Sequence, residues 1–203
     1  MTYQLYYAPA ACSLAVHIAL LEQGETPKLI KVSTKTKKTD DGGDYLAVTP
    51  KGYVPALRIP SGEILTENAA ILQYLADNKP GTIAPKAGTI ERFRVNEWLT
   101  YNTSEIHKTF SPLFNPATSD EQKKALKDKL ADRFNFVEKH LGDGRSYLTG
   151  EQFTIADIYV FVVVNWSNFT GIDLAPWPKL GAFQSRVLAR PKTQAAMKAE
   201  GLL

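Results

Sequence analysis

A single thiol stands at a point of the sequence where it could be reactive. Cys12 is the only cysteine of the chain and lies in "APAACSLAVHIALLEQG", between a short apolar run and an amphipathic run. A cysteine at the first turn of a helix faces free backbone N–H groups and the positive end of the helix dipole, and both favour the thiolate. Its neighbour Ser13 can cap the helix or donate a hydrogen bond. The alternative is a buried structural cysteine, since free cysteines are among the most buried residues.

Two further stretches place polar groups at the ends of expected elements. In "TPKGYVPAL", Val54-Pro55 opens a strand, where a proline removes a ladder donor. A cis bond there would leave the backbone of Val54 to a ligand, whereas a trans proline is the commoner case. In "LTENAAILQYLAD", Thr66, Glu67 and Asn68 begin a helix, whose free N–H groups attract an anion, and Glu67 can pair with an amine. Simple capping explains the same residues without a ligand.

A third polar group of residues follows from helical spacing. Thr100, Ser104 and His107 stand at positions i, i+4 and i+7, on one face of a predicted helix. The stripe indicates either a solvent face or the wall of a wet cleft. Near a thiolate, His107 could donate a hydrogen bond or, if protonated, lower the pKa of the thiol.

The elements that must position these side chains change in character near residue 80. Strands are expected at 3–7, 28–33, 54–59 and 63–66, helices at 13–22 and 67–78, and a solvated loop at 34–44. The later helices are expected at 89–110, 119–142, 153–169, 177–191 and 192–201. The sequence therefore predicts an α/β domain over residues 1–79, a linker over 80–88 and an all-α domain over 89–203.

One motif in the second domain has a structural explanation. Thr154 and Asp157 stand three residues apart at the start of an expected helix, which is the spacing of a capping box. Trp166, on the same expected helix, is predicted to fill the core.

Composition narrows the function classes. The chain has 203 residues, of which 44% are hydrophobic and 22% charged, with a net charge of +3. A charge this small does not favour nucleic-acid binding, and one cysteine cannot form an intrachain disulfide. The longest apolar run is too short to cross a bilayer, and the N-terminus does not read as a signal peptide. We expect a cytoplasmic protein without a metal, a membrane or a nucleic-acid partner.

The motifs together resemble a known family. The stretches "YYAPAACSLAVHIAL", "TPKGYVPAL", "ILTENAAILQYLAD", "SEIHKTFSPLF", "FTIADIYVF" and "RPKTQAAMKAEGLL" are similar to those of cytosolic glutathione S-transferases, and most closely to the bacterial beta class. "CS" before a helix combined with "HK" further on is typical of that class. The resemblance implies a thioredoxin-like β-α-β-β-α domain that holds glutathione, followed by a helical-bundle domain that contributes the site of the electrophile.

The resemblance also implies roles for single residues of the first domain. Cys12 matches a cysteine that faces glutathione and can form a mixed disulfide with it, and Val54 matches the residue whose backbone pairs with the cysteinyl unit. Glu67 and Asn68 match the pair that holds the γ-glutamyl end, although the family usually has Gly or Ser where this chain has Asn68. Lys37 matches a basic residue that reaches the glycyl carboxylate, although it stands in a lysine-rich run whose members are usually only solvated.

In the second domain, His107 and Lys108 match the "HK" pair, and Thr100 and Ser104 match ligand contacts. Some members of the family have Asn where this chain has Thr100, and a hydroxyl replaces an amide only in part.

The leading hypothesis is a glutathione transferase that conjugates the thiolate of glutathione to small hydrophobic electrophiles, as a homodimer and in detoxification. We expect Cys12, Ser13 and His107 to carry the chemistry. The runner-up is a glutathione-dependent thiol-disulfide oxidoreductase or peroxidase that acts through a mixed disulfide on Cys12. A third hypothesis, from another class, is a non-catalytic binding module.

Overall fold

The computed structural model describes residues 2–203, which form two compact units. The first unit comprises the chain up to Ala87 together with Arg190–Leu203, and the second comprises Gly88–Ala189. The sequence predicts an all-α domain over 89–203, but residues 190–203 pack with the first unit. The reason is that α9 (Pro191–Ala199) lies against α1 (Ser13–Glu22), a contact that helical periodicity cannot reveal.

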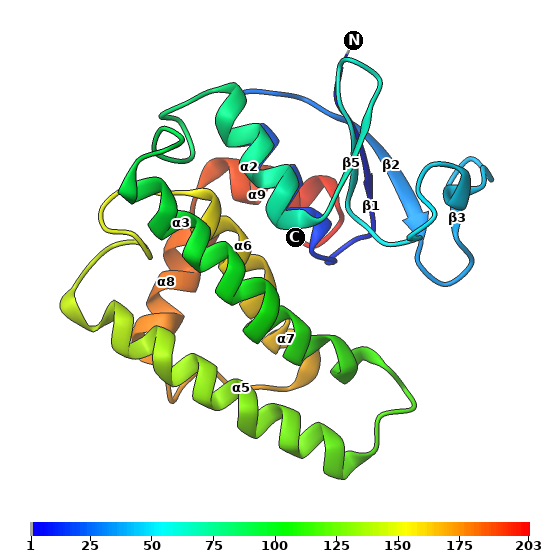
Figure 1. Ribbon diagram of the computed structural model, residues 1–203. Helices are drawn as coiled ribbons and strands as arrows, with labels where there is room; N and C mark the ends of the chain where they lie inside the picture. The colour runs from blue at the N-terminus through cyan, green and yellow to red at the C-terminus, as the bar shows by residue number, and fades with distance from the viewer. Residues whose placement is uncertain (1) are drawn as a thin grey trace. The chain divides into compact units, whose positions relative to one another are not determined.

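The first unit is built on a mixed sheet of five strands in the order β3-β2-β1-β4-β5 (Figure 1). The strands are β1 (Gln4–Tyr7), β2 (Lys28–Ser33), β3 (Lys38–Thr39), β4 (Ala56–Arg58) and β5 (Ile64–Thr66). β1 lies in the centre, parallel to β2 and antiparallel to β4. In this register Tyr6 stands beside both Ile30 and Ala56, and a cluster of buried residues that includes Tyr6 and Tyr45 forms part of the core.

Three helices complete the first unit. α1 packs against β1, α2 (Asn68–Asn78) and α9, and its residues from Ser13 to Leu20 are all buried. A single turn of 3-10 helix, η1 (Tyr45–Ala47), follows β3. The predicted order of strands and helices in this region is confirmed, except that the expected loop at 34–44 contains the short strand β3. Two residues of strand are too few to leave a period-2 pattern in a lysine-rich run.

The second unit is helical (Figure 1). Its long helices are α3 (Ile90–Tyr101), α5 (Asp120–His140), α6 (Ile155–Val164) and α8 (Pro178–Leu188). Its short ones are η2 (Asn102–His107), α4 (Lys108–Phe110), η3 (Ser111–Phe114), η4 (Leu141–Asp143) and α7 (Ser167–Thr170). Every residue of α6 is buried, and α6 packs against α3 and α8, so it is the centre of this unit's core. Among residues 2–203, none of the helices has the length and apolarity that a membrane span requires.

The start of α6 is held by a buried carboxylate. Asp157 is fully buried and accepts hydrogen bonds from the backbone N–H of Thr154 at 2.7 Å, from the Thr154 hydroxyl at 2.9 Å and from the backbone N–H of Leu148 at 2.7 Å. The predicted capping box is confirmed. The contact with Leu148 adds what the sequence motif does not predict, because it ties the preceding loop to the helix.

Replacement of Asp157 by Ala is expected to lower the free energy of unfolding at neutral pH by about 3 kcal/mol, because it leaves three buried donors without acceptors. Urea denaturation followed by circular dichroism measures the loss. Asp128→Ala is the matched control, since Asp128 is an exposed partner of Lys124 whose loss costs about 0.5 kcal/mol or less. Equal losses in the two variants would contradict the assignment.

The same carboxyl predicts a pH dependence. Burial raises the pKa of Asp157 from 3.8 to about 6, against the hydrogen bonds that favour its ionised form. The folded chain therefore holds a proton over a pH range in which the unfolded chain has lost it, so this group stabilises the fold less as pH rises. The difference in unfolding free energy between the wild type and Asp157→Ala should be largest below about pH 4 and constant above about pH 6. A difference that grows with pH would overturn this.

Candidate functional site

Cys12 lies between β1 and α1, at the N-cap of the helix, and is 9% exposed. Its thiol donates a hydrogen bond to the carbonyl oxygen of Val54, with 3.4 Å between Sγ and O. Ser13 closes the preceding loop, because its hydroxyl oxygen lies 3.3 Å from both the N and the O of Ala8. Ser13 is fully buried, and its hydrogen bonds are to the loop that carries Cys12.

The protonation state of Cys12 differs from the one expected at a helix start. Burial, with a smaller contribution from the negative charge of Glu67, raises the pKa of the thiol to about 12. The backbone N–H groups of Cys12 and Ser13 lower the pKa, as the helix position predicts, but burial outweighs them. The raised pKa favours the thiol of Cys12 over the thiolate at neutral pH, against the expectation from the helix start alone.

The peptide bond between Val54 and Pro55 is cis, which confirms the first of the two alternatives for this turn. It precedes β4, which begins at Ala56. In this structure the Val54 carbonyl oxygen accepts from the Cys12 thiol. Nearby, the Tyr45 hydroxyl donates to the carbonyl oxygen of Tyr53 at 2.8 Å, which fixes the approach to the same turn.

Lys37 differs from the other lysines of its run. Its Nζ donates to the carbonyl oxygen of Gly52 at 2.8 Å and lies 5.5 Å from the centre of the Tyr53 ring. Lys37 is half-buried, whereas its neighbours Lys35 and Lys38 are exposed. The ammonium group of Lys37 is therefore held beside the turn before the cis bond, which the sequence run does not distinguish.

Glu67 and Asn68 mark the start of α2. The Glu67 carboxylate accepts from Nζ of Lys51 at 2.6 Å, and the capping alternative is wrong because this side chain makes no capping hydrogen bond. The amine that pairs with Glu67 is therefore Lys51 of this chain, which also donates to Thr66. The first turn of α2 carries no acidic side chain, so its N–H groups remain suited to an anion.

Asn68 connects α2 to the cysteine. Its Nδ2 donates to the carbonyl oxygen of Cys12 at 2.9 Å, and the side chain is 6% exposed. Its Oδ1 is buried without a hydrogen-bond partner among the described residues. Where the family usually has Gly or Ser, this chain thus has an amide that binds the backbone of Cys12.

Backbone strain gathers around the same residues. Among residues 2–203, the non-glycine residues with positive φ are Ala10 at 62°, Lys37 at 58° and Glu67 at 69°. Residues outside glycine pay about 1 kcal/mol or more for this conformation, and such strain clusters at functional sites. All three are candidate site residues or stand two positions from Cys12. This clustering could not be read from the sequence, since Ala and Glu carry no signal for a left-handed backbone.

The second unit carries the remaining candidates, and here the expected α-helix over 89–110 is wrong in part. Residues 102–107 form a π-helix, η2, between α3 and α4. Thr100 and Ser104 are exposed, and their hydroxyls donate to carbonyl oxygens four residues earlier, of Asn96 at 2.9 Å and of Thr100 at 3.0 Å. Such bonds loosen a regular helix, and π-turns occur often at functional sites.

His107 lies at the end of η2 in an aromatic environment. Its Nδ1 is 2.7 Å from the Tyr159 hydroxyl, and its ring packs edge-on against Trp166, with 4.8 Å between centroids. Burial, with a smaller contribution from the positive charge of Lys108, lowers the pKa of His107 to about 4. The lowered pKa favours the neutral imidazole at neutral pH and gives no support to the alternative in which a protonated His107 lowers the pKa of a thiol. Trp166 is buried, as predicted.

The structure thus joins Cys12, Val54 and Asn68 by direct hydrogen bonds, and adds Ser13 through the loop. Lys37 and Glu67 lie at the strained positions described above, and Thr100, Ser104, His107 and Lys108 belong to the second unit. Sequence reasoning missed Lys51 and Tyr159. The signal for Lys51 was its place in "TPKGYVPAL", whereas Tyr159 is inside an apolar run and gave none.

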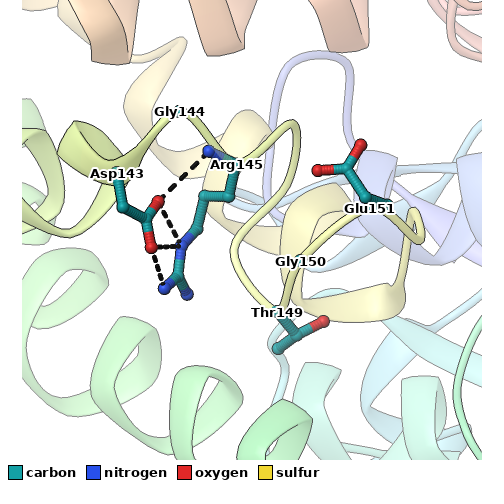
Figure 2. A pocket seen from close by; sticks show the side chains of 6 residues that line it. All are labelled: Asp143, Gly144, Arg145, Thr149, Gly150 and Glu151. Atoms are coloured by element: carbon teal, nitrogen blue, oxygen red, sulfur yellow. Dashed lines mark hydrogen bonds and ion pairs between the residues drawn. The ribbon is translucent and has the colours of Figure 1, made fainter.

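A separate cavity of about 350 Å³ in the second unit does not contain these residues. It is lined by Asp143, Gly144, Arg145, Thr149, Gly150 and Glu151. Figure 2 shows the Arg145 guanidinium turned toward Asp143, to which it donates, while Glu151 accepts from Ser146 at 2.8 Å.

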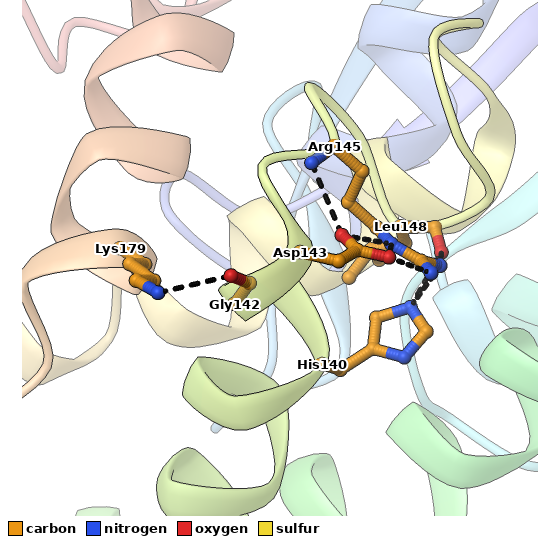
Figure 3. A network of polar contacts seen from close by, with 6 residues as sticks. All are labelled: His140, Gly142, Asp143, Arg145, Leu148 and Lys179. Carbon is orange, nitrogen blue, oxygen red and sulfur yellow. Dashed lines mark hydrogen bonds and ion pairs between the residues drawn. The ribbon is translucent and has the colours of Figure 1, made fainter.

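The charges around this cavity serve to join loop and helix ends. Arg145 also approaches Nε2 of His140 at 2.8 Å and the carbonyl oxygen of Leu148 at 3.2 Å, and Lys179 donates to Gly142 at 3.2 Å (Figure 3). Because its cations are engaged with protein partners, we assign this cavity a structural role. Among residues 2–203 there is no group of three or more His, Cys, Asp or Glu side chains that could hold a metal ion.

Comparison with known proteins agrees with the fold. Two family models match the chain: "Glutathione S-transferase, N-terminal domain" over residues 11–78 and "Glutathione S-transferase, C-terminal domain" over residues 101–191. The glutathione S-transferase GstA of Escherichia coli O157:H7 is 42% identical over 98% of this chain and 99% of its own length. The glutathione S-transferase GST-4.5 of Xanthomonas campestris is 39% identical, with 98% and 99% covered.

Solved structures give the same result. BphK, a bacterial glutathione S-transferase, superposes with a TM-score of 0.95 at 51% identity, covering 98% of this chain and 100% of that one. A sphingomonad glutathione S-transferase complexed with glutathione has a TM-score of 0.94 at 46% identity, with the same coverage. The chain belongs to the glutathione S-transferase family and is an enzyme of that class. It is similar to bacterial beta-class members, among them that of Sphingomonas chungbukensis at 46% identity, a TM-score of 0.94 and the same coverage.

The lone cysteine makes one property of the site directly measurable. Because burial raises the pKa of Cys12, we expect iodoacetamide to alkylate the folded protein at neutral pH at least about tenfold more slowly than it alkylates the same protein in concentrated urea. Intact mass against time gives both rates. An alkylation rate of the folded protein equal to that of the unfolded protein would contradict the raised pKa of Cys12. A rate that rises with pH through a midpoint below the ordinary thiol pKa would contradict it too.

Proposed function

We propose that this enzyme binds glutathione along the first unit and transfers its thiolate to small hydrophobic electrophiles. The observation that carries the proposal is the arrangement around Cys12, in which its thiol is bonded to Val54 and its carbonyl to Asn68. The cysteine, the turn before β4 and the start of α2 are therefore neighbours. This arrangement suits a tripeptide, because an exposed backbone edge can bind the centre of the ligand and the N-terminus of a helix can bind its carboxylate.

Each end of glutathione finds groups of matching chemistry. The γ-glutamyl carboxylate suits the N–H groups of the first turn of α2, and its amine suits the carboxylate of Glu67. The backbone of Val54 would pair with the cysteinyl unit. Lys37, already held at Gly52, supplies positive charge for the glycyl carboxylate, so the ligand pays little to order this side chain.

The protonation of Cys12 favours transfer over a redox role. A thiol whose pKa lies near 12 is a poor nucleophile at neutral pH, because the thiolate is the reactive form. The reacting sulfur is therefore that of glutathione, and Cys12 lies where it faces that sulfur. Rate comes from donors that stabilise the glutathione thiolate and from proximity of the two substrates.

The second unit supplies features that suit an apolar electrophile. Phe114 is half exposed and packs edge-on against Trp166, which in turn contacts His107. This apolar wall adjoins a neutral imidazole that can exchange a hydrogen bond without adding charge. We propose that Thr100, Ser104 and Lys108 contribute polar contacts from the same part of the chain.

We also propose that the enzyme is a cytoplasmic, symmetric homodimer that acts in detoxification. Exposed large apolar side chains in both units support association, among them Tyr53 in the first and Phe93 in the second. The dimer is tested by measuring the sedimentation of the wild type at low protein concentration. Tyr53→Ser is the variant compared with it. A monomer in the wild type would contradict it.

A first prediction separates conjugation from redox chemistry. Cys12→Ala should keep conjugation of a nitro-activated aryl chloride to glutathione within about fivefold of the wild-type rate, because Cys12 is not the nucleophile. Any reduction of a small mixed disulfide that the wild type catalyses should disappear in the same variant, because that reaction would need the Cys12 sulfur. Absorbance of the conjugate and of the released thiol measures the two activities, with Cys12→Ser as control. Loss of both activities would show that Cys12 is shared by them.

A second prediction concerns affinity. The wild type should bind immobilised glutathione and be eluted by free glutathione. Lys37→Met should raise the KM for glutathione about tenfold and leave kcat nearly unchanged, since it removes a contact that the ground state and the transition state share. Lys35→Met, in the same run but exposed, is the control. A wild type that does not bind would contradict both the transferase and the redox proposals.

A further inference from the structure

The C-terminal segment 190–203 is fastened to α1 at two places. Arg190 forms two hydrogen bonds with Glu22, at 2.8 and 2.9 Å, near the end of the helix. Oε1 of Glu200 lies 3.0 Å from Nδ1 of His17, and His17 stands five residues after Cys12 in α1. Between these contacts α9 packs along α1. This segment includes the stretch "RPKTQAAMKAEGLL", which has no part in the proposed chemistry.

The contact at Glu200 is deeply buried. His17 is 2% and Glu200 6% exposed. The backbone N–H of Ala10 and the His17 ring both favour the ionised carboxylate, while burial raises its pKa. Glu200 therefore bonds to α1 at His17 and to the backbone of the strained residue Ala10, on either side of Cys12.

The polar pair of His17 and Glu200 is not the most stable way to hold α9 in place. Burying a carboxylate and an imidazole costs free energy that an apolar pair of the same shape would not, and such pairs are retained in some proteins because they fix one arrangement. Oε2 of Glu200 is buried without a hydrogen-bond partner among the described residues, which adds to the cost. The apolar residues of α1, such as Leu14 and Ile18, already provide the packing.

Glu200 bonds to His17 of α1 and to the backbone N–H of Ala10, so the route from Glu200 to Cys12 runs through the loop that carries Ala10. Ala10, at a φ of 62°, holds a conformation that an alanine leaves when nothing restrains it.

We propose that Glu200 is a positioning residue which, with His17, holds the Ala8–Ala11 loop and so sets the depth at which Cys12 is buried. The inference deepens the proposed function, because it rests on Cys12 lying at the site of that function. Its test needs no glutathione.

The test compares Glu200→Ala with Glu200→Gln. Alanine removes both contacts, so iodoacetamide should alkylate folded Cys12 about tenfold faster than in the wild type, as local opening becomes easier. Glutamine keeps an acceptor for His17 and Ala10 without the charge, and should stay within about threefold of the wild type. Intact mass against time gives the rates, and the single cysteine makes them unambiguous. An unchanged rate in Glu200→Ala overturns the proposal.

Arg190→Met is the matched control, because it breaks the other attachment of the same segment, at the end of α1 away from Cys12. It should lower the thermal midpoint while leaving the alkylation rate near that of the wild type. If it speeds alkylation as much as Glu200→Ala does, the segment acts only through global stability and the proposal fails. Should Glu200→Ala not fold, His17→Gln replaces it with the same expected acceleration and the same overturning result.

Binding to immobilised glutathione keeps the two proposals apart. A wild type that does not bind glutathione, with Glu200→Ala still accelerating alkylation, contradicts the proposed function and supports the positioning role. If the wild type binds glutathione and Glu200→Ala leaves the alkylation rate unchanged, the result supports the proposed function and contradicts the positioning role.

Discussion

The hydrogen bond from the Cys12 thiol to the Val54 carbonyl determines what this site can do. It joins the start of α1 to the turn before β4, two points 42 residues apart in the chain. The bond requires the proton to stay on sulfur, and burial of the thiol favours the same form. A cysteine held as a thiol is a weak nucleophile and does not compete with another thiolate.

The surroundings of Cys12 show that its position is over-determined. Ser13 closes the loop on one side, Asn68 binds the cysteine carbonyl on another, and Glu200 approaches the loop from the C-terminal segment. The contacts of Asn68 and Glu200 come from distant parts of the sequence, and Ala10 in the same loop has a strained backbone conformation. Strain of this kind persists only where several neighbours oppose its relief. In the first unit, the position of this one loop therefore costs stability.

The helical unit solves a different physical problem. Its core is the fully buried helix α6, whose start is tied down by Asp157. On this support, the π-turn η2 interrupts the helix that bears His107. Burial among aromatic rings lowers the pKa of the imidazole and favours its neutral form, which can take part in a hydrogen bond without carrying a positive charge.

The order of strands and helices followed from the sequence, except for β3 and η2, because periodicity, capping residues and turn residues are local signals. So did the capping box at Thr154. Tertiary structure decided what local signals cannot carry. The thiol of Cys12 is protonated because the folded chain buries it, and residues 190–203 join the first unit because Glu200 and Arg190 find partners on α1. Burial and long-range pairing depend on which surfaces meet, and a single sequence does not encode that in any local pattern.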